Sequence, residues 1–170
     1  MILYHYTTLR HFLGILQAGQ INTTHSELLR PVNLHLNEEG TAYVDEATDD
    51  YKPVVWLTSN PQANPEETMA TKDSYRESKV AVRIGIERRN GMYLWEPWAK
   101  RNGMESDWMN SLKRAMPDWP NVYVYEKPIP TSMFSTLAVS DAALEKARRY
   151  DPEVAAAMEA ILDRMDQGEE

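Results

Sequence analysis

Two side chains that lie far apart in the sequence have the chemistry of a catalytic or binding site. His5 lies in the extended stretch "ILYHYT", and its imidazole can donate or accept a hydrogen bond near neutral pH. Glu126 follows the aromatic stretch "NVYVY", where a carboxylate is costly unless a partner compensates its charge. A histidine on an apolar strand is more often a satisfied core residue than a ligand, and pairing within the fold is the ordinary role of such a glutamate. Neither residue alone assigns a function.

A second candidate is the aromatic and basic segment over residues 83–114, "RIGIERRNGMYLWEPWAKRNGMESDWMNSLKR". It mixes three tryptophans with basic side chains: Trp95, Trp98 and Trp108 with Arg88, Arg89, Lys100, Arg101, Lys113 and Arg114. Exposed aromatic faces beside cations bind single-stranded nucleic acid by stacking and phosphate contacts, which makes Arg88, Arg89, Lys100 and Arg101 candidate substrate-binding residues. The alternative is an ordinary lobe in which the tryptophans pack and the basic side chains are solvated.

The absence of cysteine and of several known motifs excludes or disfavours some kinds of chemistry. There is no cysteine, so disulfides, thiolate catalysis and cysteine-type zinc sites are excluded. No HExxH pair occurs, and no carboxylate stands at metal-ligand spacing beside a histidine, so we expect no metal. The G-x-S-x-G, G-x-G-x-x-G and P-loop patterns are also missing.

Composition bounds the class of protein. The 170 residues suffice for one domain, and no apolar run approaches the roughly 20 residues that a membrane span requires. The net charge of −8 argues against a general nucleic-acid coat but leaves room for a local basic groove. The first residues do not have the pattern of a signal peptide. We expect a cytoplasmic monomer that does not bind membranes.

The elements that must position these residues can be read from periodicity. An extended segment from Ile2 leads to a helix with apolar residues at Leu9, Phe12, Leu13 and Leu16, capped by Thr8 and ended by Gly19. Alternation or β-branched runs predict strands at 21–26, 41–45, 53–61, 79–86, 121–130 and 133–139. Helices are expected at 64–72, 107–116, 141–149 and 152–165, while 87–120 has no strand pattern. The prediction is an α+β fold of one domain over 1–170, with an inserted Trp/Arg lobe at 88–120 and C-terminal helices at 141–170.

Taken together, the stretches "LYHYT", "ILQAGQI", "VVWLTSN" and "VYVYEKPIP" resemble the core motifs of the ADP-ribosyltransferase superfamily. The similarity is to its histidine-containing branch, which includes the poly-ADP-ribose polymerases, and the opening is also similar to DNA-modifying toxins and to bacterial and phage proteins of unassigned role. The motifs match in order and rough spacing from Ile2 to about Val139. Trp56 stands where many relatives carry tyrosine, and Lys127–Pro128 replace a recognisable substrate loop after Glu126.

The resemblance implies a fold of split small sheets and a site for NAD, used as a substrate, without a metal. It implies that His5 donates a hydrogen bond to a ribose hydroxyl with Thr7 assisting, and that Trp56 stacks on the nicotinamide. Ser59 and Asn60 orient the sugar, and Glu126 is catalytic. His5, Trp56 and Glu126 are then expected in one cleft.

The implied activity is transfer of ADP-ribose to a macromolecular acceptor, nucleic acid or protein, as a toxin in bacterial or phage conflict. Two alternatives stay open. One is an RNA 2′-phosphotransferase, which needs basic residues near His5, where the sequence offers Arg10. The other is a non-catalytic protein-binding inhibitor or nucleotide-binding module on the same fold.

Overall fold

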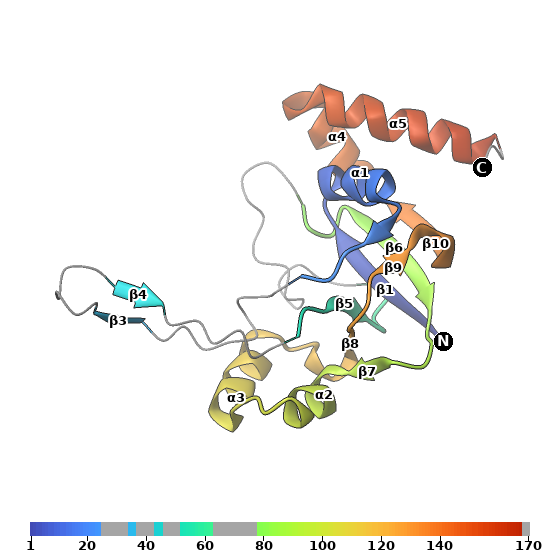
Figure 1. Ribbon diagram of the computed structural model, residues 1–170. Helices are drawn as coiled ribbons and strands as arrows, with labels where there is room; N and C mark the ends of the chain where they lie inside the picture. Colours follow the sequence, from blue (N-terminus) through green and yellow to red (C-terminus); the bar gives the residue numbers. More distant parts are fainter. Residues whose placement is uncertain (25–33, 37–42, 46–51, 63–77, 168–170) are drawn as a thin grey trace.

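The computed structural model describes residues 1–24, 34–36, 43–45, 52–62 and 78–167 and has the predicted α+β character (Figure 1). A six-stranded antiparallel sheet with the order β10-β6-β1-β5-β8-β7 forms its centre. Its strands are β1 (Ile2–Thr7), β5 (Val55–Thr58), β6 (Val82–Glu87), β7 (Met92–Leu94), β8 (Val122–Tyr125) and β10 (Phe134–Val139). Two smaller sheets pair β2 (Gln20–Ile21) with β9 (Ile129–Pro130) and β3 (Leu34–Leu36) with β4 (Tyr43–Asp45).

The two faces of the large sheet are covered by different helices. Along β5, Val55 and Leu57 join one apolar core, whereas Val54 and Trp56 face the other, as alternation along a strand requires. The first core includes side chains of α1 (Leu9–Ala18), α4 (Asp141–Tyr150) and α5 (Pro152–Asp166). The second is built on α2 (Trp95–Arg101) and α3 (Ser106–Ala115), on the far side of the sheet in Figure 1.

Helix α1 forms as its sequence predicts. The side chain of Thr8 accepts a hydrogen bond from the backbone N–H of His11, which satisfies one of the helix's unpaired donors. Gly19 ends the helix at a φ of 70°, a left-handed conformation that glycine adopts without strain. The predicted strand and helix at the start of the chain are therefore confirmed, and they fix where His5 and His11 lie.

The sequence prediction is wrong over the first part of the lobe. Residues 87–120 contain β7, which pairs with β8, and α2, which buries Trp95, Trp98 and Ala99 on one face. Pro97 is compatible with α2 because it stands in the first turn, where a backbone N–H has no helical partner. The expected helix at 64–72 lies outside the described residues, as does the end of the strand expected at 21–26.

The strand expected at 121–130 is divided in two. β8 ends at Tyr125, a short 3₁₀ turn (η2, Trp119–Asn121) precedes it, and β9 continues in the small sheet with β2. A second 3₁₀ turn (η3, Thr131–Met133) then leads into β10. Glu126 therefore stands at the break between the two sheets, immediately after β8.

Candidate functional site

Strands β1 and β5 separate shortly after they meet. β1 pairs with β6 along its whole length, from Ile2↔Glu87 to Thr7↔Val82, but with β5 only at Tyr4↔Thr58. At its other end, β5 is approached by Thr24, which exchanges two backbone hydrogen bonds with Val54 at 3.0 and 3.2 Å. The backbone groups between these two points are thus available to side chains and ligands.

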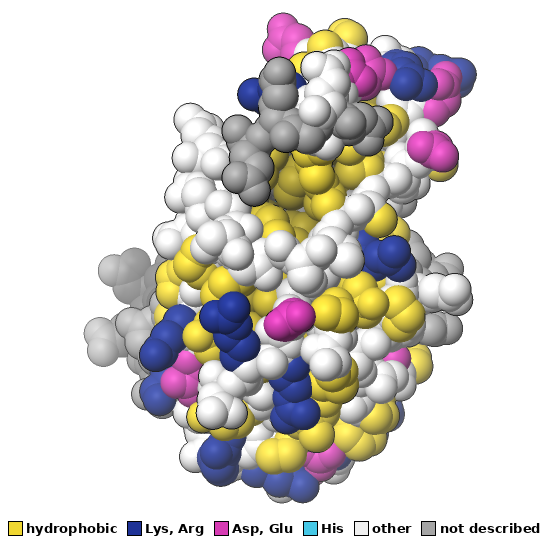
Figure 2. Space-filling model, turned by 90° about the vertical axis from the view of Figure 1, so that its right-hand side faces the viewer, with side chains coloured by type: hydrophobic (Ala, Val, Ile, Leu, Met, Phe, Trp, Pro, Cys, Tyr) yellow, Lys and Arg dark blue, Asp and Glu magenta, His cyan; other side chains and the backbone are white. Residues whose placement is uncertain are grey.

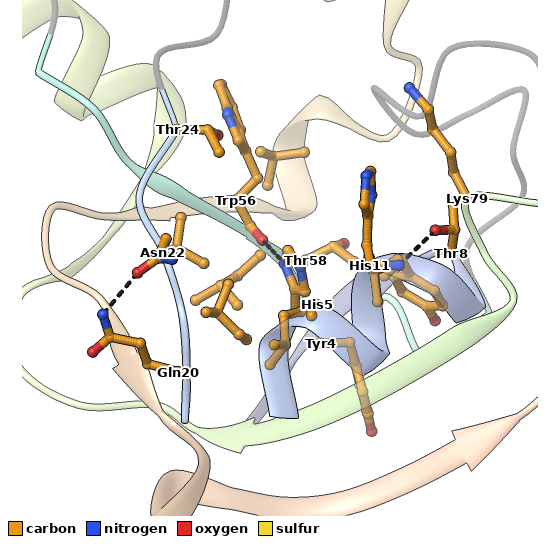
Figure 3. Close-up of a pocket in the computed structure, with 18 of the residues that line it drawn as sticks. Tyr4, His5, Thr8, His11, Gln20, Asn22, Thr24, Trp56, Thr58 and Lys79 are labelled. Atoms are coloured by element: carbon orange, nitrogen blue, oxygen red, sulfur yellow. Dashed lines mark hydrogen bonds between the residues drawn. The ribbon is translucent and has the colours of Figure 1, made fainter. Parts of the chain in front are cut away.

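The side chain of His5 bridges this separation. Its Nδ1 lies 3.0 Å from the carbonyl oxygen of Trp56, and because a carbonyl only accepts, Nδ1 carries the hydrogen (Figure 3). Burial lowers the pKa of His5 below its usual value; the Trp56 carbonyl opposes this, and the charge of His11 adds to it. A neutral ring with its hydrogen on Nδ1 leaves Nε2 as an acceptor. In this tautomer a ligand at Nε2 would meet an acceptor, whereas the resemblance implies that His5 donates to a ribose hydroxyl.

A cavity of about 620 Å³ lies beside this bridge, within the range of ligand pockets. Its lining comes from β1, from one side of α1, from the segment around β2 and from β5, with single residues before β6 and around the start of β8. Figure 3 shows His11 and Lys79 on one side, Trp56 and Thr24 on the other, and His5 between them. The described residues that line it are Tyr4, His5, Tyr6, Thr7, Thr8, His11, Gly14, Ile15, Gln20, Ile21, Asn22, Thr24, Val55, Trp56, Leu57, Thr58, Lys79, Asp118 and Val122.

Charged and titratable side chains lie toward different ends of this pocket. Lys79 and His11 lie near the Thr7 end of β1, since Val82 pairs with Thr7 and the backbone of His11 is bonded to Thr8. Asp118 lies toward the Tyr4 end, where its Oδ2 accepts a hydrogen bond of 3.1 Å from the side chain of Thr58. The pocket thus has a lysine and a histidine toward one end and a carboxylate toward the other.

Three of the residues predicted from sequence line the pocket: His5, Thr7 and Trp56. Ser59 and Asn60 do not line it. They form the turn after β5, where the backbone N–H of Ser59 donates to Asn121 at 2.9 Å and the carbonyl of Asn60 accepts from the hydroxyl of Tyr6 at 3.1 Å. Their observed contacts hold that turn against neighbouring elements.

Glu126 also stands outside the pocket lining, so the structure differs from the expectation that it shares one cleft with His5 and Trp56. Its Oε1 accepts a hydrogen bond of 2.8 Å from the indole N–H of Trp98, and its Oε2 lies 3.4 Å from the ammonium of Lys52. The Trp98 bond lowers the pKa of Glu126; burial opposes this and Lys52 adds to it, so the carboxylate stays charged. Trp98 and Trp56 both belong to the second core, so the contact with Trp98 places the Glu126 carboxylate on the Trp56 side of the sheet.

The Trp/Arg lobe does not expose its central tryptophans. Trp95 and Trp98 are 0% and 1% exposed, and Trp108 packs against the same core, so the stacking surface expected from the sequence is wrong for the two central indoles. Three of the basic side chains lie over aromatic rings: Arg88 over Tyr123 at 5.2 Å, Arg101 over Tyr93 at 4.5 Å and Lys113 over Trp119 at 4.4 Å.

Acidic partners neutralise part of the lobe's positive charge. Lys100 and Lys113 share the carboxylate of Glu96, with nitrogen–oxygen distances of 2.9 and 2.6 Å. On the face drawn in Figure 2, basic side chains are interspersed with acidic and hydrophobic ones and form no continuous basic surface. Arg88, Lys100, Arg101 and Lys113 therefore have structural partners in addition to solvent.

Among the lining residues that sequence reasoning missed are one histidine, one lysine and one aspartate: His11, Lys79 and Asp118. His11 lies in the first turn of α1, three residues after the N-cap Thr8. Lys79 and Asp118 lie in irregular segments before β6 and β8, where no periodicity marks a direction. Arg10, the basic residue that the sequence offered beside His5, pairs with Asp151 instead and does not line the pocket.

None of the helices in the described ranges combines the length and the apolar character needed to cross a bilayer. The same ranges hold no group of three or more histidine, aspartate or glutamate side chains arranged to bind a metal ion. Comparisons of the chain with protein-family models, with curated proteins and with solved structures find no match.

Proposed function

We propose that this protein is an NAD-dependent ADP-ribosyltransferase whose dinucleotide site is the pocket between β1 and β5. The observation that carries the proposal is the position of His5: its ring is fixed by the Trp56 carbonyl in a pocket of about 620 Å³, with Nε2 left to accept a hydrogen bond. A ribose hydroxyl is a suitable donor for that nitrogen. The proposal rests on this geometry together with the resemblance of the motifs to the ADP-ribosyltransferase superfamily.

In this proposal, different residues of the pocket bind different parts of NAD. Trp56 offers an aromatic face to the nicotinamide ring, and Thr7 lies beside His5 on β1. Lys79 supplies positive charge for the phosphates, and His11 supplies a ring N–H donor. Ser59 and Asn60 act on the sugar indirectly, through the turn that they hold after β5.

The reaction breaks the bond between the nicotinamide nitrogen and C1′ of the ribose. The bonding electrons stay on nitrogen, neutral nicotinamide leaves, and positive charge develops on the ribose as in glycoside cleavage. The nucleophile of the acceptor then bonds to C1′ and loses a proton. Glu126 stands outside the pocket lining but is the proposed catalytic carboxylate. This role requires the bound ribose to reach the side of the sheet where Trp98 holds the charge of Glu126, which then stabilises the developing cation or takes that proton.

The acceptor is nucleic acid or protein, and Arg88, Arg89, Lys100 and Arg101 are its proposed binding residues. Because Trp95 and Trp98 are buried, these cations act through phosphates or acidic side chains and not beside stacked bases on those indoles. A toxin role in bacterial or phage conflict, inside the cytoplasm and as a monomer, is part of the same proposal.

One alternative function gains support from a specific observation. An RNA 2′-phosphotransferase needs basic side chains beside the histidine, and Lys79 and His11 line the pocket with His5. Such an enzyme also consumes NAD, but its acceptor group is a 2′-phosphate on RNA. A non-catalytic nucleotide-binding module is the remaining alternative.

The deciding experiment is incubation with NAD labelled in the adenosine part, together with separate pools of protein, DNA, RNA and 2′-phosphorylated RNA. We expect nicotinamide release, followed by chromatography, and label on one pool, identified by mass spectrometry. Release only with 2′-phosphorylated RNA assigns the phosphotransferase. Binding of NAD without release or transfer, measured by calorimetry, assigns the binding module, and no binding contradicts all three.

The pocket assignment is tested by His5→Ala and Trp56→Ala, which should weaken NAD binding. The matched control is Tyr93→Ala, a partly exposed aromatic on β7 outside the pocket, which should bind NAD as the wild type does. Equal NAD affinity in all three variants would place the dinucleotide elsewhere.

A further inference from the structure

Asp118 is the acidic side chain among the described residues of the pocket lining. Both of its oxygens are held by neutral donors: Oδ2 by the hydroxyl of Thr58 at 3.1 Å and Oδ1 by the amide of Asn121 at 2.6 Å. Over the described part of the chain no lysine, arginine or histidine pairs with it. Its negative charge is therefore oriented but not neutralised.

The orientation of Asp118 is set by the end of β5. Thr58 is buried, and its hydroxyl oxygen accepts a hydrogen bond of 3.0 Å from the backbone N–H of Asn60. That contact leaves the hydroxyl hydrogen directed to Asp118. A carboxylate fixed in this way needs little rearrangement to meet a ligand.

Glu126 shows what a compensated carboxylate looks like in the same molecule. Its charge is shared with the ammonium of Lys52 and the indole N–H of Trp98, outside the pocket lining. Asp118 has no such cation and faces a cavity of ligand size. A positively charged group on a ligand would supply the missing partner.

Trp56 lines the same pocket, and an aromatic face also attracts cations, most strongly when the cation is partly desolvated. A carboxylate and an indole together favour a flat ring that carries positive charge. In NAD that ring is the oxidised nicotinamide, a pyridinium cation. In NADH the same ring is reduced and neutral.

We propose that Asp118, together with Trp56, makes the pocket selective for the oxidised, cationic form of the dinucleotide over the reduced form. This inference rests on the proposed function, because it assumes that the pocket binds NAD. Lys79 and His11, toward the Thr7 end of the pocket, meet phosphates that both forms carry, so they contribute equally to the two affinities. The ratio of the affinities thus isolates the effect of the ring charge.

The test is calorimetric titration of the full chain with NAD and with NADH. We expect the wild type to bind NAD roughly tenfold more tightly than NADH, which corresponds to about 1.4 kcal/mol. Asp118→Asn keeps the size of the side chain and an acceptor for Thr58 but removes the charge. Its affinity for NADH should stay within about twofold of the wild type, and its preference for NAD should fall to about twofold or less.

The matched control is Asp107→Asn, the same chemical change on an exposed residue of α3 outside the pocket, which should keep the wild-type ratio. An unchanged NADH affinity also verifies that Asp118→Asn is folded. If the wild type binds and cleaves NAD while Asp118→Asn keeps the full preference, the inference is overturned and the proposed function stands. If the wild type binds neither form, both are overturned.

Discussion

The pocket between β1 and β5 and the lobe formed by β7, α2 and α3 use similar residue types in opposite ways. In the pocket, the imidazole of His5 and the carboxylate of Asp118 are fixed by neutral partners and keep polar capacity for a ligand. In the lobe, Glu96 is shared by two lysines, and Trp95 and Trp98 are buried. The comparison teaches that a site is marked by polar groups that are oriented but not neutralised, and not by how many charged and aromatic residues a segment holds.

Glu126 stands between the two regions. Its carboxylate is anchored to the lobe through Trp98, which belongs to the same core as Trp56, so Glu126 lies on the Trp56 side of the sheet. If the lobe and the pocket act together, Glu126 is the residue through which they do so. The predictions below separate what each region contributes, beginning with the largest effect.

The first prediction is that the tryptophans of the lobe stabilise the fold, whereas that of the pocket acts in binding. Trp95→Ala should lower the free energy of unfolding by about 3–5 kcal/mol, since the indole is completely buried. Trp56→Ala should cost less, because that side chain is only partly buried, but should weaken NAD binding. Urea unfolding and calorimetry measure the two effects. The reverse order of stability costs would contradict the contrast between the regions.

The second prediction concerns the reaction. Glu126→Gln keeps the size of the side chain and removes a charge that acts mainly on the transition state, so the transfer rate should fall by about 10²–10³-fold while the NAD affinity is nearly kept. Single-turnover nicotinamide release with saturating NAD measures the rate. Wild-type activity in this variant would assign catalysis to another carboxylate, and Asp118→Asn, assayed in parallel, would then be the first variant to compare.

The third prediction compares two buried indoles in the lobe. The N–H of Trp98 bonds to charged Glu126, whereas the N–H of Trp95 is buried without a partner among the described residues. Trp98→Phe should therefore cost about 1.5–3 kcal/mol more than Trp95→Phe, because both lose similar volume but only one loses a hydrogen bond to a charge. Equal costs in urea unfolding would mean that the Trp98–Glu126 bond contributes nothing net.

The substitution Trp98→Phe should also change the pKa of Glu126. The Trp98 bond is the largest cause that holds the pKa of Glu126 below its usual value, so Trp98→Phe should raise that pKa toward the usual value. The transfer rate of the variant should then decline at a higher pH than that of the wild type as the solution is acidified. An identical acid limb in the two proteins would show that Glu126 does not govern the rate.

The fourth prediction is a pH dependence at the pocket. The pKa of His5 is lowered in the folded protein, so as pH falls below about 6.5 the unfolded chain takes up the proton first, and the folded state loses stability until pH reaches the folded pKa. Each unit of lowering corresponds to about 1.4 kcal/mol. Urea unfolding of the wild type and His5→Gln between pH 7.5 and 5 measures this. The variant should lack the His5 part of the decline.

Features of the fold that depend on residues close together in the sequence could be predicted, whereas features that depend on distant residues could not. The cap at Thr8, the end of α1 at Gly19, the alternation of β6 and the presence of β10 depend on neighbouring residues, and they were predicted. The break after Tyr125 was not, because β8 and β9 join different sheets through partners far away in the sequence. Helix α2 was missed because aromatic residues and a proline obscure its short apolar face.

The candidate site shows the same limit. His5 and Trp56 were identified through motifs, but their contact exists because β1 and β5 separate after one residue pair, which no local pattern reveals. Asp118 lies in "MPDWPN", between a helix and a strand, where nothing in the spacing indicates a cavity. The burial of Trp95 and Trp98 was equally hidden, since the same mixture of aromatic and basic residues occurs on binding surfaces and in packed lobes.

The smallest expected effect belongs to the basic side chains of the lobe and asks whether they bind the acceptor at all. Replacing Arg88, Arg89, Lys100 and Arg101 together by alanine should weaken binding to a single-stranded oligonucleotide several-fold at low salt, with little difference at high salt. The effect is small because Arg88 and Arg101 already lie over tyrosine rings and Lys100 already pairs with Glu96, so phosphates compete with these partners. Fluorescence anisotropy at two salt concentrations measures it. The matched control replaces the same number of cations on α4 and α5, Lys146, Arg148, Arg149 and Arg164, by alanine and should leave the binding unchanged. Equal weakening by both sets would show only general charge attraction, and no weakening by the lobe variant would leave protein as the acceptor to be sought.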